Sequence, residues 1–138
     1  MTWDEDALDL IVETTRGYPY FLQELGKQVW DSAEGLDVIT LRDTEEAIPS
    51  ALDELDTGFF AVRIDRASDT ERAYLSAMAS LGEGPYGSGD VAAVLGKGTR
   101  QVGTVRDSLI KRGVCYSPGY GLIEFTVPMF DQFVRRAL

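Results

Sequence analysis

The sequence predicts a mainly α (α+β) protein in which a small helical bundle precedes a second helical unit containing a β-hairpin. Three observations lead to this fold class. Apolar residues recur at i, i+3 and i+4 along most of the 138 residues, as they do on one face of a helix. Two short β-prone runs flank a Pro/Gly turn at 118–121. Acidic residues concentrate in the first part of the chain, which indicates two units. We place these units at 1–56 and 68–138, joined by an aromatic segment at 57–67.

The charge distribution separates the two units more clearly than the net charge of −10 does. Residues 1–56 hold 15 acids and three bases, a net of −12, whereas residues 57–138 hold eight acids and ten bases, a net of +2. The acidity of the whole chain would argue against nucleic acid as a partner. Because nearly all of it belongs to the first unit, the second remains a candidate for binding nucleic acid.

The residue types also exclude several kinds of site. With one cysteine and no histidine, the sequence allows no disulfide framework, histidine-based zinc site or histidine-containing catalytic triad. No apolar run approaches the roughly 20 residues that span a bilayer. We therefore expect a soluble cytoplasmic protein with no metal site, no catalytic residues, no membrane partner and no complete active site of its own.

The first unit contains three helical patterns. Thr2 and Glu5 have the spacing of a capping box ahead of a helix that reaches Thr15. Pro19 suits the first turn of a second helix, which extends to about residue 30. After a polar loop at 31–38, Thr40 caps a third helix, and Pro49 is expected to kink or divide it.

The second unit begins with a further capping box formed by Ser68 and Glu71, followed by an apolar helix. After a loop at 82–87, we expect a short helix over 88–95, a glycine turn, and a helix over 99–112 with Thr99 as its N-cap. The hairpin follows, and a last helix starts near Pro128. Helix, turn, helix and hairpin in this order resemble a winged helix-turn-helix domain.

The helix over 99–112 is the strongest functional candidate in the sequence. Val102, Val105 and Leu109 form its inward stripe, so the opposite face is mostly cationic and hydroxylic. A recognition helix presents such a face to DNA, although a solvated helix face remains an equally good interpretation. The candidate DNA-binding residues are Lys97, Arg100, Gln101, Thr104, Lys111 and Arg112.

A second resemblance starts from the run Arg16-Gly17-Tyr18-Pro19-Tyr20-Phe21-Leu22-Gln23. This run, the helical bundle around it and the winged helix downstream resemble the C-terminal region of prokaryotic AAA+ or STAND-type P-loop ATPases, similar to the origin-recognition initiators. The resemblance implies that the bundle is a lid over ATP or ADP, and that Arg16, Gly17, Tyr18 and Pro19 lie near the nucleotide. Because the chain has no Walker A motif, the expectation is a fragment whose P-loop ATPase core precedes it, with no cofactor bound by this chain itself.

The function expected from these features is binding of double-stranded DNA by the winged helix, controlled by the nucleotide state that the lid senses. The alternative is a winged helix that acts as a protein-interaction or autoinhibitory module. In that case its partner is the P-loop ATPase core, another protein or a second copy of the chain.

Overall fold

The chain is mainly helical, with a few short strands. A computed structural model describes residues 2–33 and 35–138, and the chain divides into two compact units, Met1–Phe59 and Phe60–Leu138. The boundary between them falls inside the segment 57–67. None of the helices in the described ranges combines the length and the apolar character that a membrane crossing requires.

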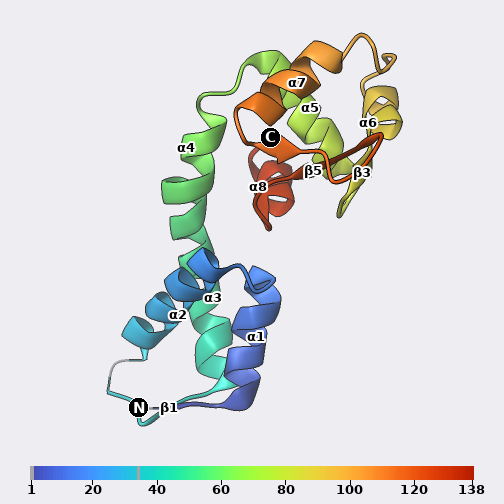
Figure 1. Cartoon of the computed structure of the whole chain (residues 1–138). Coiled ribbons are helices and arrows are strands. Elements are labelled where there is room, and N and C mark those ends of the chain that lie inside the picture. The colour runs from blue at the N-terminus through green and yellow to red at the C-terminus, as the bar shows by residue number, and fades with distance from the viewer. Residues whose placement is uncertain (1, 34) are drawn as a thin grey trace. The chain divides into compact units, whose positions relative to one another are not determined.

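The first unit is a bundle of α1 (Glu5–Thr15), α2 (Pro19–Ser32) and α3 (Leu41–Leu55), each packed against the other two (Figure 1). At one end, β1 (Thr2–Trp3) pairs in parallel with β2 (Val38–Ile39). The inner face of α3 carries small residues, so its neighbours can approach closely. The buried apolar side chains include Ala7, Ile11, Phe21, Leu25, Val29, Ile39, Ala47, Ala51 and Leu55.

The capping box predicted from Thr2 and Glu5 is wrong. Thr2 belongs to β1, where its N–H donates to the Asp37 carbonyl at 2.9 Å, and Asp4 is the N-cap of α1 without a side-chain cap bond. Because residues 2–3 pair with β2, their backbone is extended and the helix starts later than the cap signature indicates.

The other two helix starts of the first unit agree with the sequence. Pro19 occupies the first position of α2, and Thr40 caps α3 in a reciprocal box with Asp43. Pro49, however, does not divide α3, which continues through it to Leu55. Pro49 is exposed, so its missing N–H removes one bond of the ladder while the buried face of the helix, with Ala47 and Ala51, stays packed.

Residues 56–64 are helical, with a π-helical turn at Asp56–Phe60 followed by α4 (Ala61–Ile64). Phe60 is fully buried in the second unit, where its ring centroid lies 5.5 Å from that of Phe130 and 5.3 Å from that of Phe133. Phe60 of this aromatic segment therefore belongs to the core of the second unit.

In the second unit, α5 (Asp69–Ser80) packs against α6 (Ser88–Val94), α7 (Gly103–Lys111) and α8 (Phe130–Ala137) (Figure 1). Ser68 and Glu71 form the predicted capping box at the start of α5. The core also takes in aromatic residues of the sheet and of α8. Its largest fully buried side chains include Tyr74, Phe60, Phe130, Leu75, Met78, Leu109, Ile123 and Met129.

The sheet of the second unit has three antiparallel strands in the order β3–β5–β4, formed by β3 (Tyr86–Gly87), β5 (Leu122–Phe125) and β4 (Cys115–Tyr116). β4 and β5 form the predicted hairpin. β3 lies in the segment predicted to be a loop, because two residues give no alternating pattern and their partner lies more than 30 residues downstream.

Candidate functional site

The turn between α6 and α7 positions the first of the predicted DNA-binding residues. Gly96 has φ +68° at the end of α6, where the Lys97 N–H donates to the Ala92 carbonyl at 3.0 Å and the Gly96 N–H donates to the Ala93 carbonyl at 3.0 Å. This pair of bonds is a Schellman motif, which needs a left-handed residue at the position of Gly96. The glycine turn is therefore where the sequence predicts it, and the backbone of Lys97 is fixed within it.

The predicted start of the following helix at Thr99 is wrong, because α7 begins at Gly103. The Gln101 N–H donates to the Gly98 carbonyl at 3.1 Å, and the Gln101 side chain accepts from the Gly98 N–H at 2.8 Å. Since these two bonds close a separate turn, Arg100 and Gln101 precede the helix. Gln101 orients this turn with its side-chain oxygen.

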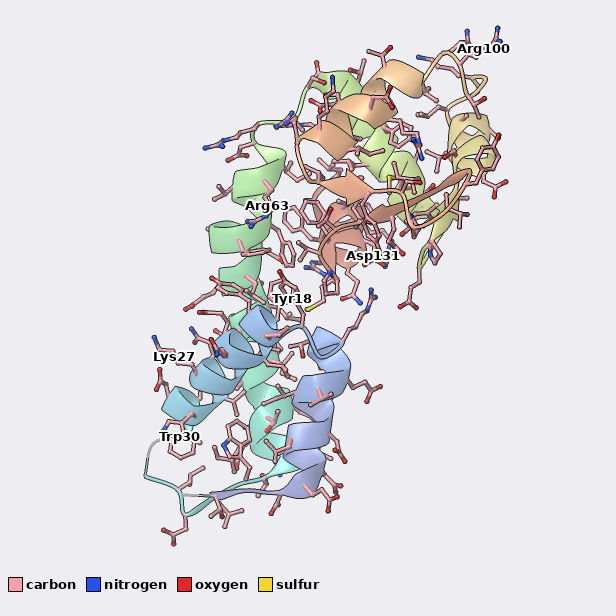
Figure 2. The ribbon with its side chains drawn as sticks, viewed as in Figure 1. Tyr18, Lys27, Trp30, Arg63, Arg100 and Asp131 are labelled. Atoms are coloured by element: carbon pink, nitrogen blue, oxygen red, sulfur yellow. The ribbon has the colours of Figure 1, made fainter. Side chains whose placement is uncertain are left out.

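Ion pairing divides the predicted cations. Lys97, Arg100 and Lys111 are exposed, and within the described part of the chain their side chains form no ion pair. Arg100 lies in the loop between α6 and α7 (Figure 2), and Lys111 is the last residue of α7. Thr104 is also exposed, in the first turn of α7. We call these four exposed residues, Lys97, Arg100, Thr104 and Lys111, the α7 surface.

Arg112, the predicted flanking phosphate contact, is already held in an ion pair. Its Nη1 lies 2.7 Å from Oε1 of Glu71, a carboxylate whose side chain is 8% exposed. Glu71 also accepts a bond from Ser108 at 3.0 Å and one from the Ser68 N–H at 2.9 Å. Burial alone would raise the pKa of Glu71, but these hydrogen bonds and the Arg112 charge outweigh it and lower that pKa below its usual value. Arg112 therefore ties the end of α7 to the start of α5.

Arg106 is a structural residue that the sequence analysis did not single out. Its Nε donates to Ser88 Oγ at 3.2 Å, and its Nη2 donates to the Leu122 carbonyl at 3.0 Å. It thus connects α7 to α6 and to β5. The sequence signal for this role is that Arg106 follows Val105 at the border of the apolar stripe. An arginine at such a border can extend across a packed face and bond to neighbouring elements.

The hairpin presents an uncharged tip. Ser117 Oγ donates to the Gly119 carbonyl at 2.8 Å, which holds the turn, and Tyr120 is fully exposed. Cys115, in β4, is buried beside Met78 with the two sulfur atoms 3.9 Å apart. Burial, together with the Glu124 carboxylate, raises the pKa of the Cys115 thiol to about 12, with Arg106 acting in the opposite direction. Since the reactive species is the thiolate, this cysteine is inert at neutral pH.

The predicted nucleotide-proximal residues form the turn between α1 and α2. Arg16 and Gly17 both have positive φ, +53° and +75°, and Tyr18 is the extended N-cap of α2 before Pro19 (Figure 2). A left-handed conformation is unusual for arginine and is held here by the bonds that end α1, including Gly17 N–H to the Val12 carbonyl at 3.1 Å. The turn gathers these four residues between α1 and α2.

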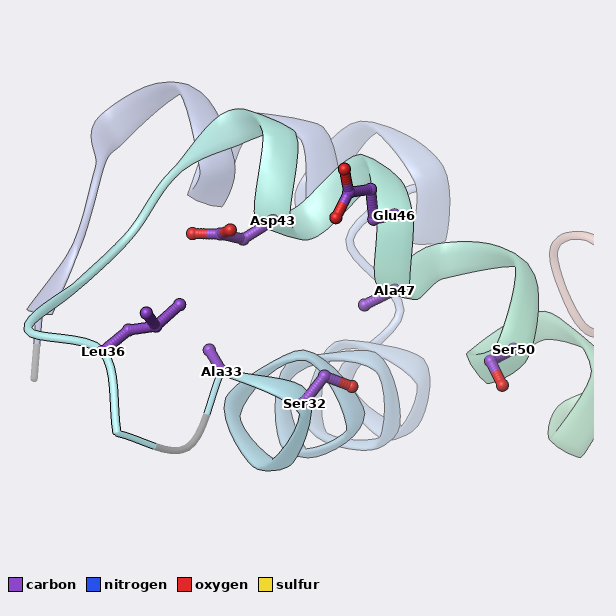
Figure 3. Close-up of a pocket in the computed structure, with 7 residues that line it drawn as sticks. All are labelled: Ser32, Ala33, Leu36, Asp43, Glu46, Ala47 and Ser50. Atoms are coloured by element: carbon purple, nitrogen blue, oxygen red, sulfur yellow. The ribbon is translucent and has the colours of Figure 1, made fainter.

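A shallow hollow of about 200 Å³ in the first unit includes the carboxylates of Asp43 and Glu46 (Figure 3). Both are already engaged, Asp43 by the Thr40 cap and Glu46 by Arg42 at 3.1 Å. The hydrogen bonds from Thr40 lower the pKa of Asp43, so this acid is not poised for proton transfer at neutral pH. Among the described residues, no three of the His, Cys, Asp and Glu side chains are grouped so as to hold a metal ion.

Comparison with protein families matches residues 57–134, which include most of the second unit, to a family described as a domain of unknown function (DUF8462). The match covers more than half of the chain, which therefore belongs to this family. No curated protein matches the sequence.

Proposed function

We propose that the second unit is a winged helix-turn-helix that binds double-stranded DNA through the α7 surface. The observation that carries this proposal is the set of three exposed cations, Lys97, Arg100 and Lys111, around one short helix. Phosphate contacts from such cations supply most of the affinity of nucleic-acid binding. Thr104, in the first turn of α7, lies where a recognition helix contacts base edges.

The order of elements supports the same proposal. α6, the Gly96 turn and α7 are followed by the hairpin of β4 and β5, on a core that α5 completes. The exposed Tyr120 at the hairpin tip offers a hydroxyl to a sugar-phosphate backbone. Because the tip has no cation, we assign most of the affinity to α7 and the turn before it.

Fluorescence anisotropy of a labelled duplex, titrated with the full chain at several salt concentrations, tests DNA binding. Three phosphate contacts give a log–log salt slope of about −2.7, so the affinity should fall roughly 40-fold between 50 and 200 mM salt. Arg100→Glu/Lys111→Glu should abolish the salt-dependent binding.

The matched control is Lys27→Glu/Arg42→Glu, which makes the same change in net charge on exposed residues of the first unit. It should keep the wild-type affinity within about twofold, because these cations lie on helices of the other unit. Equal losses in the two double variants would assign the binding to overall charge and contradict the α7 surface.

The first unit is proposed to couple DNA binding to ATP or ADP as part of a AAA+ or STAND-type ATPase. The resemblance of Arg16 to Pro19 to a lid motif supports this assignment, and so does the left-handed conformation of Arg16 in that turn, since strained backbone often marks functional sites. The lid acts together with a P-loop core, so titration of this chain with ATP or ADP should leave the NMR resonances of residues 16–20 unmoved. Saturable shifts there would contradict that division of roles.

A second candidate function, protein docking, is favoured by exposed apolar side chains. Leu8 and Val12 lie one turn apart on α1 and are 45% and 51% exposed, and Trp30 on α2 is 42% exposed. If the duplex does not bind at low salt, sedimentation velocity is the next measurement. Association that depends on concentration and is lost in Leu8→Ser/Val12→Ser would support docking between copies of the chain.

A further inference from the structure

We propose that the second unit carries an oxoanion site that takes the phosphate group of a phosphomonoester with an apolar organic part. The site is a hollow of about 470 Å³ lined by Val62, Arg63, Arg66, Arg112 and Val114. It brings together α4, Arg66 shortly after this helix, and Arg112 and Val114, which both follow the last residue of α7. We call it the arginine groove.

The charged side chains that line the groove are all arginines. Arg63 and Arg66 are three residues apart, a spacing that places side chains on the same side of a helical turn, and Figure 2 shows Arg63 on α4. No carboxylate is among the residues that line this hollow. Guanidinium groups match oxoanions in geometry because their N–H donors form a planar fork that bonds two oxygens at once. Arg63 and Arg112 each also have a partner within the chain, and the donors that remain on the three arginines around this hollow favour an anion carrying several oxygens.

Arg112 gives the groove a fixed wall. Its bond to Glu71 uses Nη1, and Glu71 is held in turn by Ser68 and Ser108. A guanidinium has five N–H donors, so those on the other two nitrogens remain for a ligand. Since Glu71 already holds the side chain, less conformational entropy is lost when an anion binds.

The size and the remaining walls of the groove indicate an organic part on the ligand. A volume of about 470 Å³ exceeds what a single phosphate ion fills and lies within the range of small-molecule pockets, roughly 300–1,000 Å³. Val62, which is 50% exposed, and Val114 add apolar surface beside the arginines. A phosphomonoester whose organic part covers these valines would use both the charged and the apolar walls.

The arginine groove is separate from Lys97 and Arg100, the proposed DNA-binding residues that precede α7. Lys97 and Arg100 precede the first residue of α7, whereas Arg112 follows the last, and a nine-residue helix spans about 13 Å. The phosphate group could come from a free phosphomonoester or from a nucleic-acid backbone. The two sources are distinguished by measuring how substitutions at the groove and at Lys97 and Arg100 change the affinity for a phosphomonoester and for a DNA duplex.

The test is a ¹H–¹⁵N NMR titration of the full chain with phenyl phosphate and with inorganic phosphate, each compared with sodium chloride at equal ionic strength. We expect saturable shifts at residues 62–66 and 112–114, and tighter binding of phenyl phosphate because its ring covers the valines. Arg63→Gln/Arg66→Gln should weaken phenyl phosphate at least about tenfold. Arg63→Lys/Arg66→Lys keeps the charge but loses the planar fork of the guanidinium group. Its affinity for phenyl phosphate should lie between that of the glutamine variant and that of the wild type.

The matched control is Lys97→Gln/Arg100→Gln, which removes two exposed cations from the same unit and should leave phenyl phosphate binding within about twofold. Arg112 is left unchanged because it also holds Glu71, and circular dichroism checks that each variant is folded. Equal weakening in the two glutamine variants, or shifts that do not saturate or are scattered over the chain, would overturn the arginine groove.

Duplex anisotropy with the same variants identifies the source of the phosphate. If only Lys97→Gln/Arg100→Gln weakens the duplex, the groove serves a separate phosphomonoester, and if both weaken it, the groove also binds backbone phosphates. Duplex binding without phenyl phosphate binding would overturn the groove and leave the α7 surface standing. Phenyl phosphate binding without duplex binding would overturn the α7 surface and leave the arginine groove standing.

Discussion

Glu71 shows how one residue can serve two elements. Its carboxylate caps α5 through Ser68 and holds α7 through Ser108 and Arg112. The capping role follows from local spacing, whereas the bonds to α7 join residues 37 and 41 positions apart. A buried charge with this many donors is strongly destabilising to remove, because each donor loses its partner.

Replacing Glu71 should therefore lower the stability of the second unit. Glu71→Gln keeps the shape but loses the charge, and should reduce the free energy of unfolding by about 1–3 kcal/mol at neutral pH. Asp69→Asn, an exposed first-turn acid of the same helix, is the matched control and should change it by less than about 0.5 kcal/mol. Equal effects of the two substitutions would assign the loss to the helix dipole.

The difference in stability between the wild type and Glu71→Gln should become smaller as the pH falls. Because the native pKa of Glu71 is lowered from its usual 4.5, the unfolded chain takes up this proton more readily than the native chain. The stabilisation from Glu71 is complete above pH 4.5 and is lost as the pH falls further, through the native pKa. Urea denaturation from pH 7 to pH 3 should show the wild type and Glu71→Gln converging in acid, and a constant gap would contradict this.

Tyr74 and Tyr86 are both buried, but their hydroxyl groups differ in hydrogen bonding. The Tyr74 hydroxyl has no hydrogen-bond partner among the described residues, whereas the Tyr86 hydroxyl donates to the Gly82 carbonyl at 2.7 Å. Tyr74→Phe should leave stability unchanged or raise it by up to about 1 kcal/mol, and Tyr86→Phe should lower it by about 1 kcal/mol. Thermal unfolding followed by circular dichroism compares the two, and a clear loss in Tyr74→Phe would mean that its hydroxyl is bonded.

At the scale of elements, α7 differs most from its prediction. Its apolar stripe predicts that a helix is present there, but its start moves from Thr99 to Gly103 because the Gly98–Gln101 turn satisfies the same backbone groups in another way. Its end at Gly113 follows the sequence, since φ is +75° there and the Val114 N–H bonds the Leu109 carbonyl. The glycines at the two ends thus have different roles.

Alanine substitutions should separate these roles. Gly103→Ala meets no atom within 4 Å and needs no positive φ, so it should stabilise the second unit by roughly 0.5–1 kcal/mol. Gly113→Ala forces a left-handed alanine and should destabilise the unit by about 1 kcal/mol. Chemical denaturation measures both, and a loss in Gly103→Ala would contradict the open space described at that position.

At the scale of the whole molecule, the chain contains a natural probe for each unit. Both tryptophans, Trp3 and Trp30, lie in the first unit, and the single cysteine, Cys115, is buried in the second. Native Cys115 should resist thiol reagents near pH 8, because its pKa is raised to about 12, and should react only when the second unit unfolds.

We expect tryptophan fluorescence and Cys115 labelling to report separate transitions in a guanidinium titration, since each unit has its own core. Glu71→Gln should move the labelling midpoint to lower denaturant and leave the fluorescence midpoint in place. If both midpoints move together, the two units unfold as one cooperative body and the division at residue 59 has no thermodynamic meaning.

Local signals in the sequence determine much of this protein. Periodic apolar residues, the Thr40 and Ser68 capping boxes, Pro19 at a first helical position, and the glycines at 96 and 113 act over a few residues, so the mainly helical class and most helix ends follow from them. The concentration of acids before residue 57 likewise predicts the chemical difference between the two units.

Tertiary structure decided the features that depend on distant partners. Pairing with β2 made residues 2–3 a strand, β5 gave β3 its partner, and a packed inner face carried α3 through Pro49. Glu71 likewise engages Arg112 in an ion pair, and the fold places Arg112 at the arginine groove with Arg63 and Arg66. The physical reason is common to all of them, because hydrogen bonds, ion pairs and burial between residues far apart in the chain leave no periodic or spacing pattern in the sequence.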